Sequence, residues 1–214
     1  MKNLDFRVYV ITACVLEMGR THEQVAAAAI RGGATMIQFR DKTMSEKQFT
    51  ETAARITVLT RAGGVPLIVN DRVEIAVAIG ADGVHIGRND GNVRDIRKAL
   101  PAGMVLGVSV TNYLEAIEMN ATDADYLGVG PIFPTGSKDD AAPAIGVEEL
   151  ARIRRNVNKP LVAIGGMNQE NLRRVIEAGA AGAAVMSAVT RAPDMARAVA
   201  ELRGVWQRAT LPLS

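Results

Sequence analysis

The sequence is poor in cysteine and contains no long apolar run. The single cysteine, Cys14, excludes a disulfide within the chain, and beside apolar residues at a predicted strand end we expect it to be a small buried residue without a chemical role. No apolar stretch approaches the length that spans a membrane, and residues 1–5 are polar and lead into the first apolar run without a basic and apolar leader. These absences predict a cytoplasmic protein.

An excess of charge of one sign is also missing. Lys and Arg total 25 and Asp and Glu total 23, which gives a net charge of +2, and the basic residues are spread along the chain. This distribution argues against a nucleic-acid partner and fits small anions better. The length of 214 residues predicts one globular domain, 1–214, and leaves open whether the protein forms a homo-oligomer.

Eight short apolar runs are predicted to be strands. Most are almost continuously apolar, which is typical of parallel strands buried on both faces. The predicted strands are Arg7 to Thr12, Thr35 to Arg40, Pro66 to Asn70, Gly83 to Gly87, Met104 to Val110, Tyr126 to Gly130, Pro160 to Gly165 and Gly182 to Val189.

Segments of helical period separate these strands, and several begin with Ser, Thr or Asn as N-caps. They are Thr21 to Arg31, Ser45 to Arg61, Arg72 to Ile79, Gly91 to Leu100, Asn112 to Asn120, Val147 to Asn156, Asn168 to Ala178 and Pro193 to Gln207. Eight consecutive strand-helix units predict an α/β fold, a (β/α)₈ TIM barrel. An open doubly wound sheet is the alternative, although the chain lacks the glycine fingerprint of a dinucleotide site.

The second strand ends in a run of polar residues. Its period of two places Gln38, Arg40 and Lys42 on one face and Phe39 and Asp41 on the other. If the first face looks into the barrel mouth, its cations need an anionic partner there. A strand that ends in a solvated, charged turn is the competing interpretation.

Carboxylates follow the next two strands. Asn70, Asp71 and Asp90 could each be a helix cap, which would be the better interpretation of any one alone. Taken together, Asp71 and Asp90 at the exits of adjacent barrel strands would lie close enough to share a divalent cation. Mg²⁺ is usually held by one or two carboxylates together with substrate phosphates.

Later strand ends carry groups suited to phosphate. The Ser109 hydroxyl could bond a phosphate oxygen or cap its own backbone. Residues 130–140 form the longest non-helical connection and combine hydroxyls, glycine and Lys138, which fits either a lid over a phosphate or a solvated loop tip. The pairs at 165–166 and 186–187 lie where such barrels commonly bind phosphate through backbone N–H groups.

The two histidines are expected to be structural. His85 could act as a general base, but a hydrogen-bonded core histidine is the preferred interpretation, and His22 on a helix is expected to be solvated. No Ser-His or Cys-His pair stands out as a nucleophilic site.

From Tyr9 nearly to the C-terminus the chain resembles the thiamine phosphate synthase (thiamine-phosphate pyrophosphorylase) family. The motifs that carry the resemblance are Gln38-Phe39-Arg40-Asp41-Lys42, Val69-Asn70-Asp71, Ala81-Asp82-Gly83-Val84-His85-Ile86-Gly87, Gly107-Val108-Ser109, Gly128 to Thr135 with Ser137-Lys138, and Ala163-Ile164-Gly165-Gly166. The resemblance implies a transferase of thiamine biosynthesis. Such an enzyme couples an aminopyrimidine diphosphate, 4-amino-2-methyl-5-hydroxymethylpyrimidine diphosphate, with a thiazole phosphate or its carboxylated form and yields thiamine monophosphate and diphosphate.

The resemblance also implies roles for individual residues. Gln38, Phe39, Arg40, Asp41, Lys42, Asn70, Ser109 and Lys138 would bind the pyrimidine diphosphate, and Arg40, Lys42, Ser109 and Lys138 would be catalytic. Thr135, Gly136, Ser137, Gly166, Met186 and Ser187 would bind the thiazole phosphate, and Asp71 and Asp90 would bind Mg²⁺. The implied chemistry is an early loss of diphosphate, which leaves a pyrimidine-methyl cation for the thiazole nitrogen.

The chain departs from the usual family pattern at two places. Where the family commonly has Gly-Gln-x-Asp, this sequence has Gly87-Arg88-Asn89-Asp90, which adds a cation beside the metal site. After the serine the family often has Ala-His, whereas this sequence has Val110-Thr111-Asn112. Three alternatives remain at this stage: a thiazole tautomerase on the same barrel, a non-catalytic protein that binds a phosphorylated ligand, and a phosphate-binding barrel of another pathway.

Overall fold

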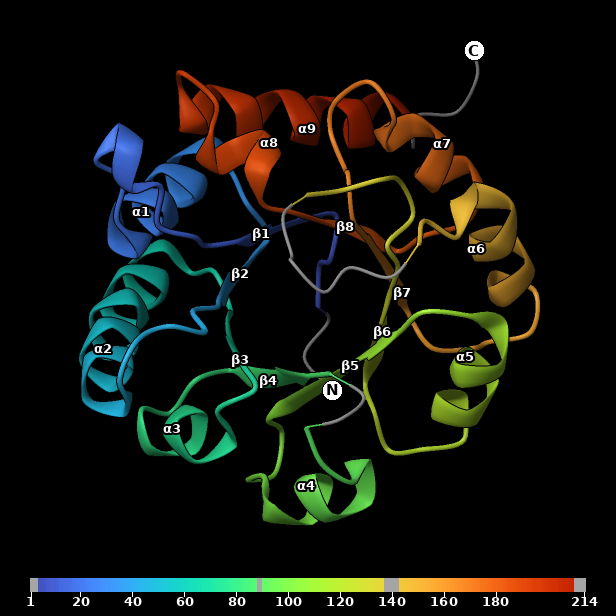
Figure 1. Ribbon diagram of the computed structural model, residues 1–214, viewed down its shortest axis with the longest axis horizontal. Helices are drawn as coiled ribbons and strands as arrows, with labels where there is room; N and C mark the ends of the chain where they lie inside the picture. The colour runs from blue at the N-terminus through green and yellow to red at the C-terminus, as the bar shows by residue number, and fades with distance from the viewer. Residues whose placement is uncertain (1–3, 88–89, 137–142, 210–214) are drawn as a thin grey trace.

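The described part of the chain contains eight parallel strands that close into a barrel in sequence order, with β8 paired to β1 (Figure 1). The computed structural model describes residues 4–87, 90–136 and 143–209. The strands are β1 Val8–Ile11, β2 Met36–Phe39, β3 Leu67–Asn70, β4 Gly83–Ile86, β5 Val105–Val110, β6 Tyr126–Val129, β7 Leu161–Ile164 and β8 Gly182–Val185. The predicted TIM barrel is confirmed.

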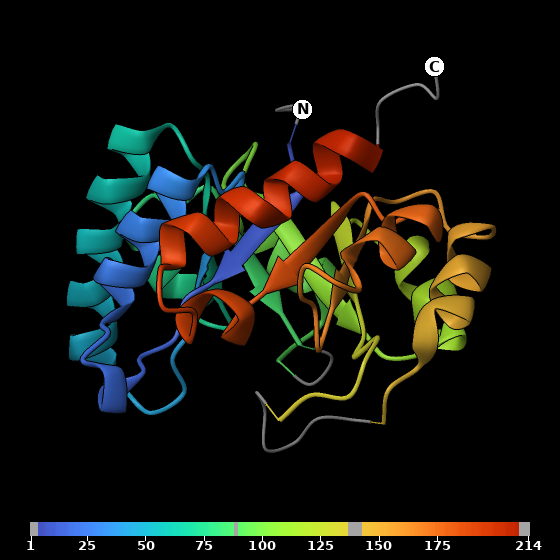
Figure 2. The same ribbon diagram turned by 90° about the horizontal axis from the view of Figure 1, so that it is seen from above.

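Helices form a ring around this barrel, as Figures 1 and 2 show from two directions. They are α1 His22–Gly32, α2 Glu46–Gly63, α3 Val73–Ala78, α4 Val93–Ala99, α5 Tyr113–Asn120, α6 Gly146–Arg154, α7 Leu172–Glu177, α8 Ser187–Thr190 and α9 Met195–Ala209, with a 3₁₀ turn, η1, at Leu16–Met18. No helix within these described ranges has the length and apolar character needed to cross a membrane.

The prediction of one long eighth strand to Val189 is wrong. The strand ends at Val185, Met186 bends the backbone, and Ser187–Thr190 forms the short helix α8. The run is largely apolar, and an apolar run alone does not distinguish a buried strand from a buried helix. This break brings Met186 and Ser187 to the end of the barrel.

The alternation along each strand separates two apolar layers. On β1, Tyr9 and Ile11 belong to the cluster inside the barrel, while Val8 and Val10 belong to the larger cluster beneath the helices. Side chains therefore fill the barrel interior, and only its end leaves room for a ligand.

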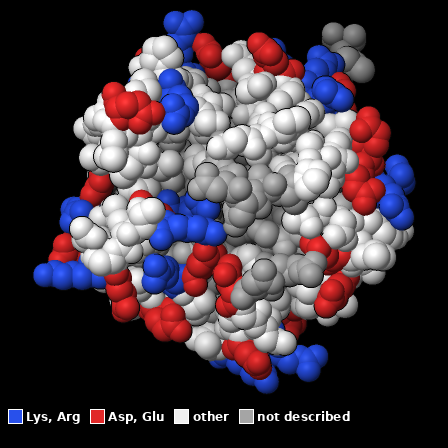
Figure 3. Space-filling view, in the orientation of Figure 1, with Lys and Arg blue, Asp and Glu red and all other residues white. Residues whose placement is uncertain are grey.

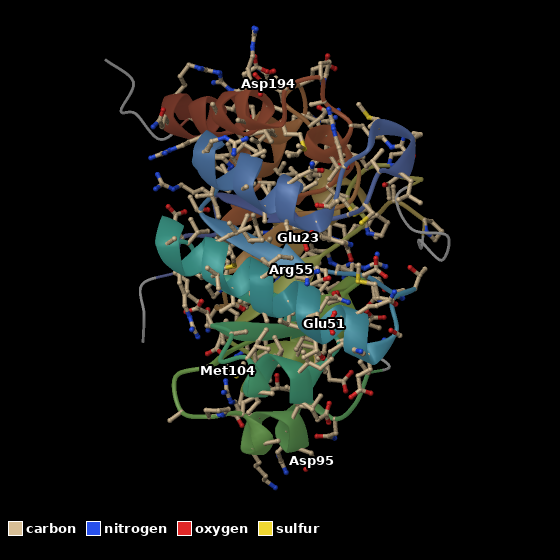
Figure 4. The ribbon with its side chains drawn as sticks, turned by 90° about the vertical axis from the view of Figure 1, so that its left-hand side faces the viewer. Glu23, Glu51, Arg55, Asp95, Met104 and Asp194 are labelled. Carbon is tan, nitrogen blue, oxygen red and sulfur yellow. The ribbon has the colours of Figure 1, made fainter. Side chains whose placement is uncertain are left out.

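The two longest helices of the N-terminal half are held by local and cross-helix contacts. Capping boxes begin both: Thr21 pairs with Gln24 at α1 and Ser45 pairs with Gln48 at α2. Figure 4 shows the two helices side by side, where the Nε of Arg55 on α2 lies 2.8 Å from Oε1 of Glu23 on α1. These contacts fix the starts of α1 and α2 and hold the two helices together.

Candidate functional site

A cavity of about 310 Å³ opens at the end of the barrel where the strands finish. Among the predicted site residues, those that line it are Gln38, Arg40, Lys42, Asn70, Asp71, Asp90, Ser109, Thr135, Gly166, Met186 and Ser187. In Figure 3, basic and acidic side chains lie next to each other beside the centre of this face. The fold therefore brings residues that are far apart in sequence to one cavity.

The side chains at the end of the second strand alternate between the cavity and the helices, as the period of two predicts. Gln38, Arg40 and Lys42 line the cavity, whereas Phe39 is fully buried on the helix side, where its ring lies 4.3 Å from that of Phe49. Asp41 also lies outside the cavity lining. Its Oδ1 accepts hydrogen bonds from the backbone of residues 43 and 44, which stabilise the turn after the strand.

The carboxylates of Asp71 and Asp90 form a repulsive pair in the cavity wall. Burial first, and the Asp90 carboxyl second, raise the pKa of Asp71 to about 6, although Lys42 and Arg40 oppose this effect. Asp71 also has a left-handed φ of 62°, which is uncommon for a residue other than glycine. Its N–H donates to the carbonyl of His85 at 2.9 Å, so the strained backbone is held by β4.

These two residues fit a divalent cation. Asp90 is anchored, because its Oδ2 accepts a 2.6 Å hydrogen bond from the N–H of Gly87. Carboxylate oxygens are the ligands that hard cations prefer, and a cation between the two carboxylates would remove the repulsion that raises the pKa of Asp71. The preceding residues 88–89 lie outside the described residues.

The glycine pair after β7 forms a second part of the cavity wall. Gly165 and Gly166 have left-handed φ angles of 92° and 65°, and Cβ atoms there would come within 2.4 Å of Pro131 and 2.6 Å of the Pro134 carbonyl. Only glycine permits this close approach of two backbones. The N–H of Ile132 also donates to the carbonyl of Ile164 at 2.8 Å, which ties the segment after β6 to β7.

Other predicted residues of this region are placed differently. Thr135 lines the cavity, Gly136 is exposed and does not line it, and Ser137 and Lys138 lie outside the described residues. Ser187 begins α8, where backbone N–H groups of the first turn have no acceptor within the helix. A phosphate beside Gly166 and Ser187 would therefore meet backbone donors.

Buried polar side chains continue from the cavity into the barrel. Gln38 donates from Nε2 to the Tyr9 hydroxyl at 2.8 Å, and the hydroxyls of Tyr9 and Tyr126 lie 2.9 Å apart. His85 lies 2.9 Å from the Tyr126 hydroxyl through Nδ1 and 2.9 Å from the Ser109 hydroxyl through Nε2. The prediction that His85 is a hydrogen-bonded core histidine is confirmed.

Sequence reasoning did not include Tyr9 and Tyr126 among the cavity residues, although both line the cavity. The available signal was their rarity as polar aromatic residues within otherwise aliphatic strands. Position in the strand alone does not show that strands 1 and 6 face each other across the barrel.

Two predictions about residues near the first strand are wrong. His22 is buried instead of solvated: its ring nitrogens lie 2.8 Å from the Thr12 hydroxyl and 3.0 Å from an Asp41 oxygen, and burial lowers its pKa. Cys14 is exposed instead of buried. Cys14 lies in the segment after β1, which ends at Ile11, and His22 is the first residue of α1, where helical position alone does not decide which side chains face the core.

Cys14, His22 and Asp41 place potential ligand atoms within 4.8 Å of one another. The two histidine nitrogens and both Asp41 oxygens already have hydrogen-bond partners. We therefore interpret this cluster as a structural contact between the turn after β2 and the start of α1.

Comparisons with known proteins agree with this geometry. Residues 8–189 match the family described as thiamine monophosphate synthase. The thiamine-phosphate synthase of Chloroflexus aurantiacus is 50% identical over 202 residues, covering 94% of this chain and 93% of the relative, and that of Archaeoglobus fulgidus is 47% identical over 195 residues, covering 91% and 90%. The structure of thiamine phosphate pyrophosphorylase from Pyrococcus furiosus matches with a TM-score of 0.88 and 36% identity, covering 97% of this chain and 98% of that one.

Proposed function

The chain belongs to the thiamine monophosphate synthase family, and we propose that its cavity joins an aminopyrimidine diphosphate to a thiazole phosphate, or to its carboxylated form. The products are thiamine monophosphate and diphosphate, so the protein is a transferase of thiamine biosynthesis. The observation that carries the proposal is the meeting of cations, a carboxylate pair and a phosphate-sized glycine turn in one cavity.

The cationic part of the cavity suits the diphosphate leaving group. Arg40 and Lys42 from the end of β2, Asn70 from β3 and Ser109 from β5 all line it. Negative charge accumulates on the diphosphate as its bond to the pyrimidine methylene carbon breaks. Preformed cations and hydrogen-bond donors at that position lower the barrier, and no protein nucleophile is required. By resemblance, Lys138 joins this set from outside the described residues.

The residues Asp71 and Asp90 would hold Mg²⁺. When bound, the ion would supply positive charge to the departing diphosphate. The carboxylates of the protein would provide the oxygen ligands after adjacent strands, while Arg40 and Lys42, which follow β2, would neutralise the remaining charge of the leaving group. This division of roles explains why cations and carboxylates lie in the same cavity.

The thiazole phosphate would lie on the opposite side of the cavity. Thr135, Gly166, Met186 and Ser187 line that side, and the left-handed turn at Gly166 leaves room for a phosphate to approach backbone N–H groups. Ser137 is assigned to the same subsite by resemblance alone. The pyrimidine would contact Gln38, whose amide is almost fully buried beneath the cations.

A thiazole tautomerase is the second candidate, because it would use the same phosphate site. It has no need for Arg40, Lys42 and the carboxylate pair, all of which line the cavity. These residues therefore favour the transferase. We further propose that the enzyme works in the cytoplasm on small phosphorylated substrates.

The test is to mix the purified protein with the pyrimidine diphosphate, the thiazole phosphate and Mg²⁺, with and without chelator, and to follow diphosphate release and thiamine phosphate formation. Metal-dependent appearance of both products is the expected result. Arg40→Gln should lower kcat strongly, whereas the matched control Arg55→Gln, an exposed arginine of α2, should not. Interconversion of thiazole tautomers without product formation would favour the tautomerase instead.

A further inference from the structure

Five side chains form one unbroken hydrogen-bonded chain across the barrel interior. In order they are Gln38, Tyr9, Tyr126, His85 and Ser109, and each neighbouring pair is separated by 2.8 or 2.9 Å. Its two ends are the residues proposed above to contact the pyrimidine and the diphosphate. The chain therefore connects the two parts of one substrate through the protein.

The orientation of Gln38, the first of these five side chains, determines which atom donates in every hydrogen bond of the series. The Gln38 Nε2 can only donate, so the Tyr9 oxygen accepts and its single proton must go to Tyr126. The Tyr126 proton then goes to Nδ1 of His85, because Tyr9 already donates to that hydroxyl. His85 consequently carries its proton on Nε2 and donates it to the Ser109 oxygen. The Ser109 hydroxyl proton remains available to the cavity.

Burial supports this order of protons. Tyr9 and Tyr126 are fully buried, and burial raises the pKa of both phenols, so each keeps its proton. A buried hydroxyl proton without an acceptor is costly, which disfavours any mixed arrangement with two donors facing each other. A doubly protonated His85 would create such a conflict, because Tyr126 would then accept from both Tyr9 and His85 and neither of them would accept the proton of Tyr126.

Rotation of the Gln38 amide would reverse the whole chain. With the amide oxygen toward Tyr9, each hydroxyl donates in the opposite direction and His85 carries its proton on Nδ1. Ser109 would then donate to Nε2 of His85 and would present only lone pairs to the cavity. An anionic leaving group would meet repulsion where the first arrangement offers a donor.

We propose that these five hydrogen-bonded side chains form a relay, in which the orientation of the Gln38 amide determines whether the Ser109 hydroxyl proton points into the cavity. Tyr9, Tyr126 and His85 are positioning residues. The proposal rests on the proposed function, because it gives the relay an aminopyrimidine at one end and a diphosphate at the other. An amino group of the pyrimidine donates to the Gln38 oxygen, which keeps Nε2 toward Tyr9. Recognition of the correct pyrimidine then holds the Ser109 proton in the direction of the leaving group, the direction it already has in the ligand-free protein.

The direct test is the tautomer of His85, read from ¹⁵N shifts of protein labelled at histidine. The polypeptide contains two histidines, so the spectrum of the His22→Gln variant identifies the signals that belong to His85. We expect the wild-type protein without ligand to carry the His85 proton on Nε2. A proton on Nδ1 in the folded wild-type protein would overturn the proposal, and this measurement needs no variant of the relay.

A reversing variant tests the causal step. In Gln38→Glu the ionised side chain can only accept, so raising the pH from 7 to 10 should move the His85 proton to Nδ1 as the introduced carboxyl group ionises. Tyr9→Phe added to this variant disconnects the introduced carboxylate from Tyr126, and the proton should return to Nε2. An Nε2 proton throughout the range in Gln38→Glu would contradict the relay.

Measurements of kcat and KM distinguish the relay from a direct effect of Gln38 on substrate binding. Loss of a preformed donor to a developing anion typically costs about 10²- to 10³-fold in kcat, and we expect Gln38→Glu to fall by about 10²-fold at high pH. The added Tyr9→Phe should recover part of kcat without restoring KM for the pyrimidine diphosphate. Additive losses in the double variant would contradict the relay. If the tautomer moves as expected and the wild-type protein forms no thiamine phosphate, the proposed function fails while the relay stands.

Discussion

Replacing Asp71 with Asn should make the metal-free protein more stable at pH 8 and remove Mg²⁺-dependent turnover. Burial and the Asp90 carboxyl raise the pKa of Asp71 from 3.8 to about 6. A folded-state pKa above the unfolded value means that the folded protein holds this proton more tightly. The free energy of unfolding therefore falls as the pH rises through the range from about 4 to 6. Asparagine cannot ionise, and it tolerates the left-handed backbone at this position.

The size of the effect follows from the pKa of Asp71. A rise from 3.8 to about 6 corresponds to about 3 kcal/mol at 1.36 kcal/mol per pKa unit. The carboxyl is partly exposed, and solvent screens its interaction with Asp90, so we expect about 1 to 2 kcal/mol at pH 8. In a chain of 214 residues this raises Tm by about 2 to 8 °C.

The assay is thermal unfolding in chelator at pH 8 and pH 4, with Asp95→Asn as a control at a well-exposed carboxylate. The advantage of Asp71→Asn should shrink at pH 4 to about a fifth of its value at pH 8. Added Mg²⁺ should then raise the Tm of the wild-type protein and leave that of Asp71→Asn unchanged. A variant that is less stable than wild type at pH 8, or an advantage equal at both pH values, would refute the reasoning.

Three further predictions concern other parts of the molecule. Gly166→Ala should lower Tm more than Gly64→Ala, because the two glycines have similar left-handed φ angles of 65° and 63° but only Gly166 would place a Cβ 2.6 Å from a carbonyl oxygen. Gly166→Ala should also raise KM for the thiazole phosphate about tenfold or more, since the turn beside the phosphate shifts; equal effects of the two variants would argue against the close approach. Burial lowers the pKa of His22, so the unfolded chain takes up its proton first and stability falls as the pH drops below about 6.5. The Tm of His22→Asn should depend less on pH between 7.5 and 5.5, and an unchanged dependence would show that other groups dominate. Lys138→Ala should lower kcat more than it weakens thiazole phosphate binding, as separate kcat and binding measurements would reveal, and equal losses would indicate a structural role for the loop.

Much of the fold was predictable because the signals are local. Continuous apolar runs followed by capped helices specify eight strand-helix units, and the period of two at Gln38, Arg40 and Lys42 places their side chains in the barrel mouth. The failures occurred where one local pattern serves two structures. The apolar run at 182–189 contains both β8 and the start of α8, and helical position alone did not show that His22 faces the core.

The sequence by itself determined the order of the elements and the chemical groups at each strand end, because both depend on residues within a few positions of one another. Only the tertiary structure decided which of these groups meet. Tyr9 and Tyr126 are separated by 117 positions yet share a hydrogen bond. The pKa of Asp71 likewise depends on the carboxyl of Asp90, which follows the next strand. Closing the barrel creates these neighbours, since the distance between two strands in space is set by the sheet and not by their separation along the chain.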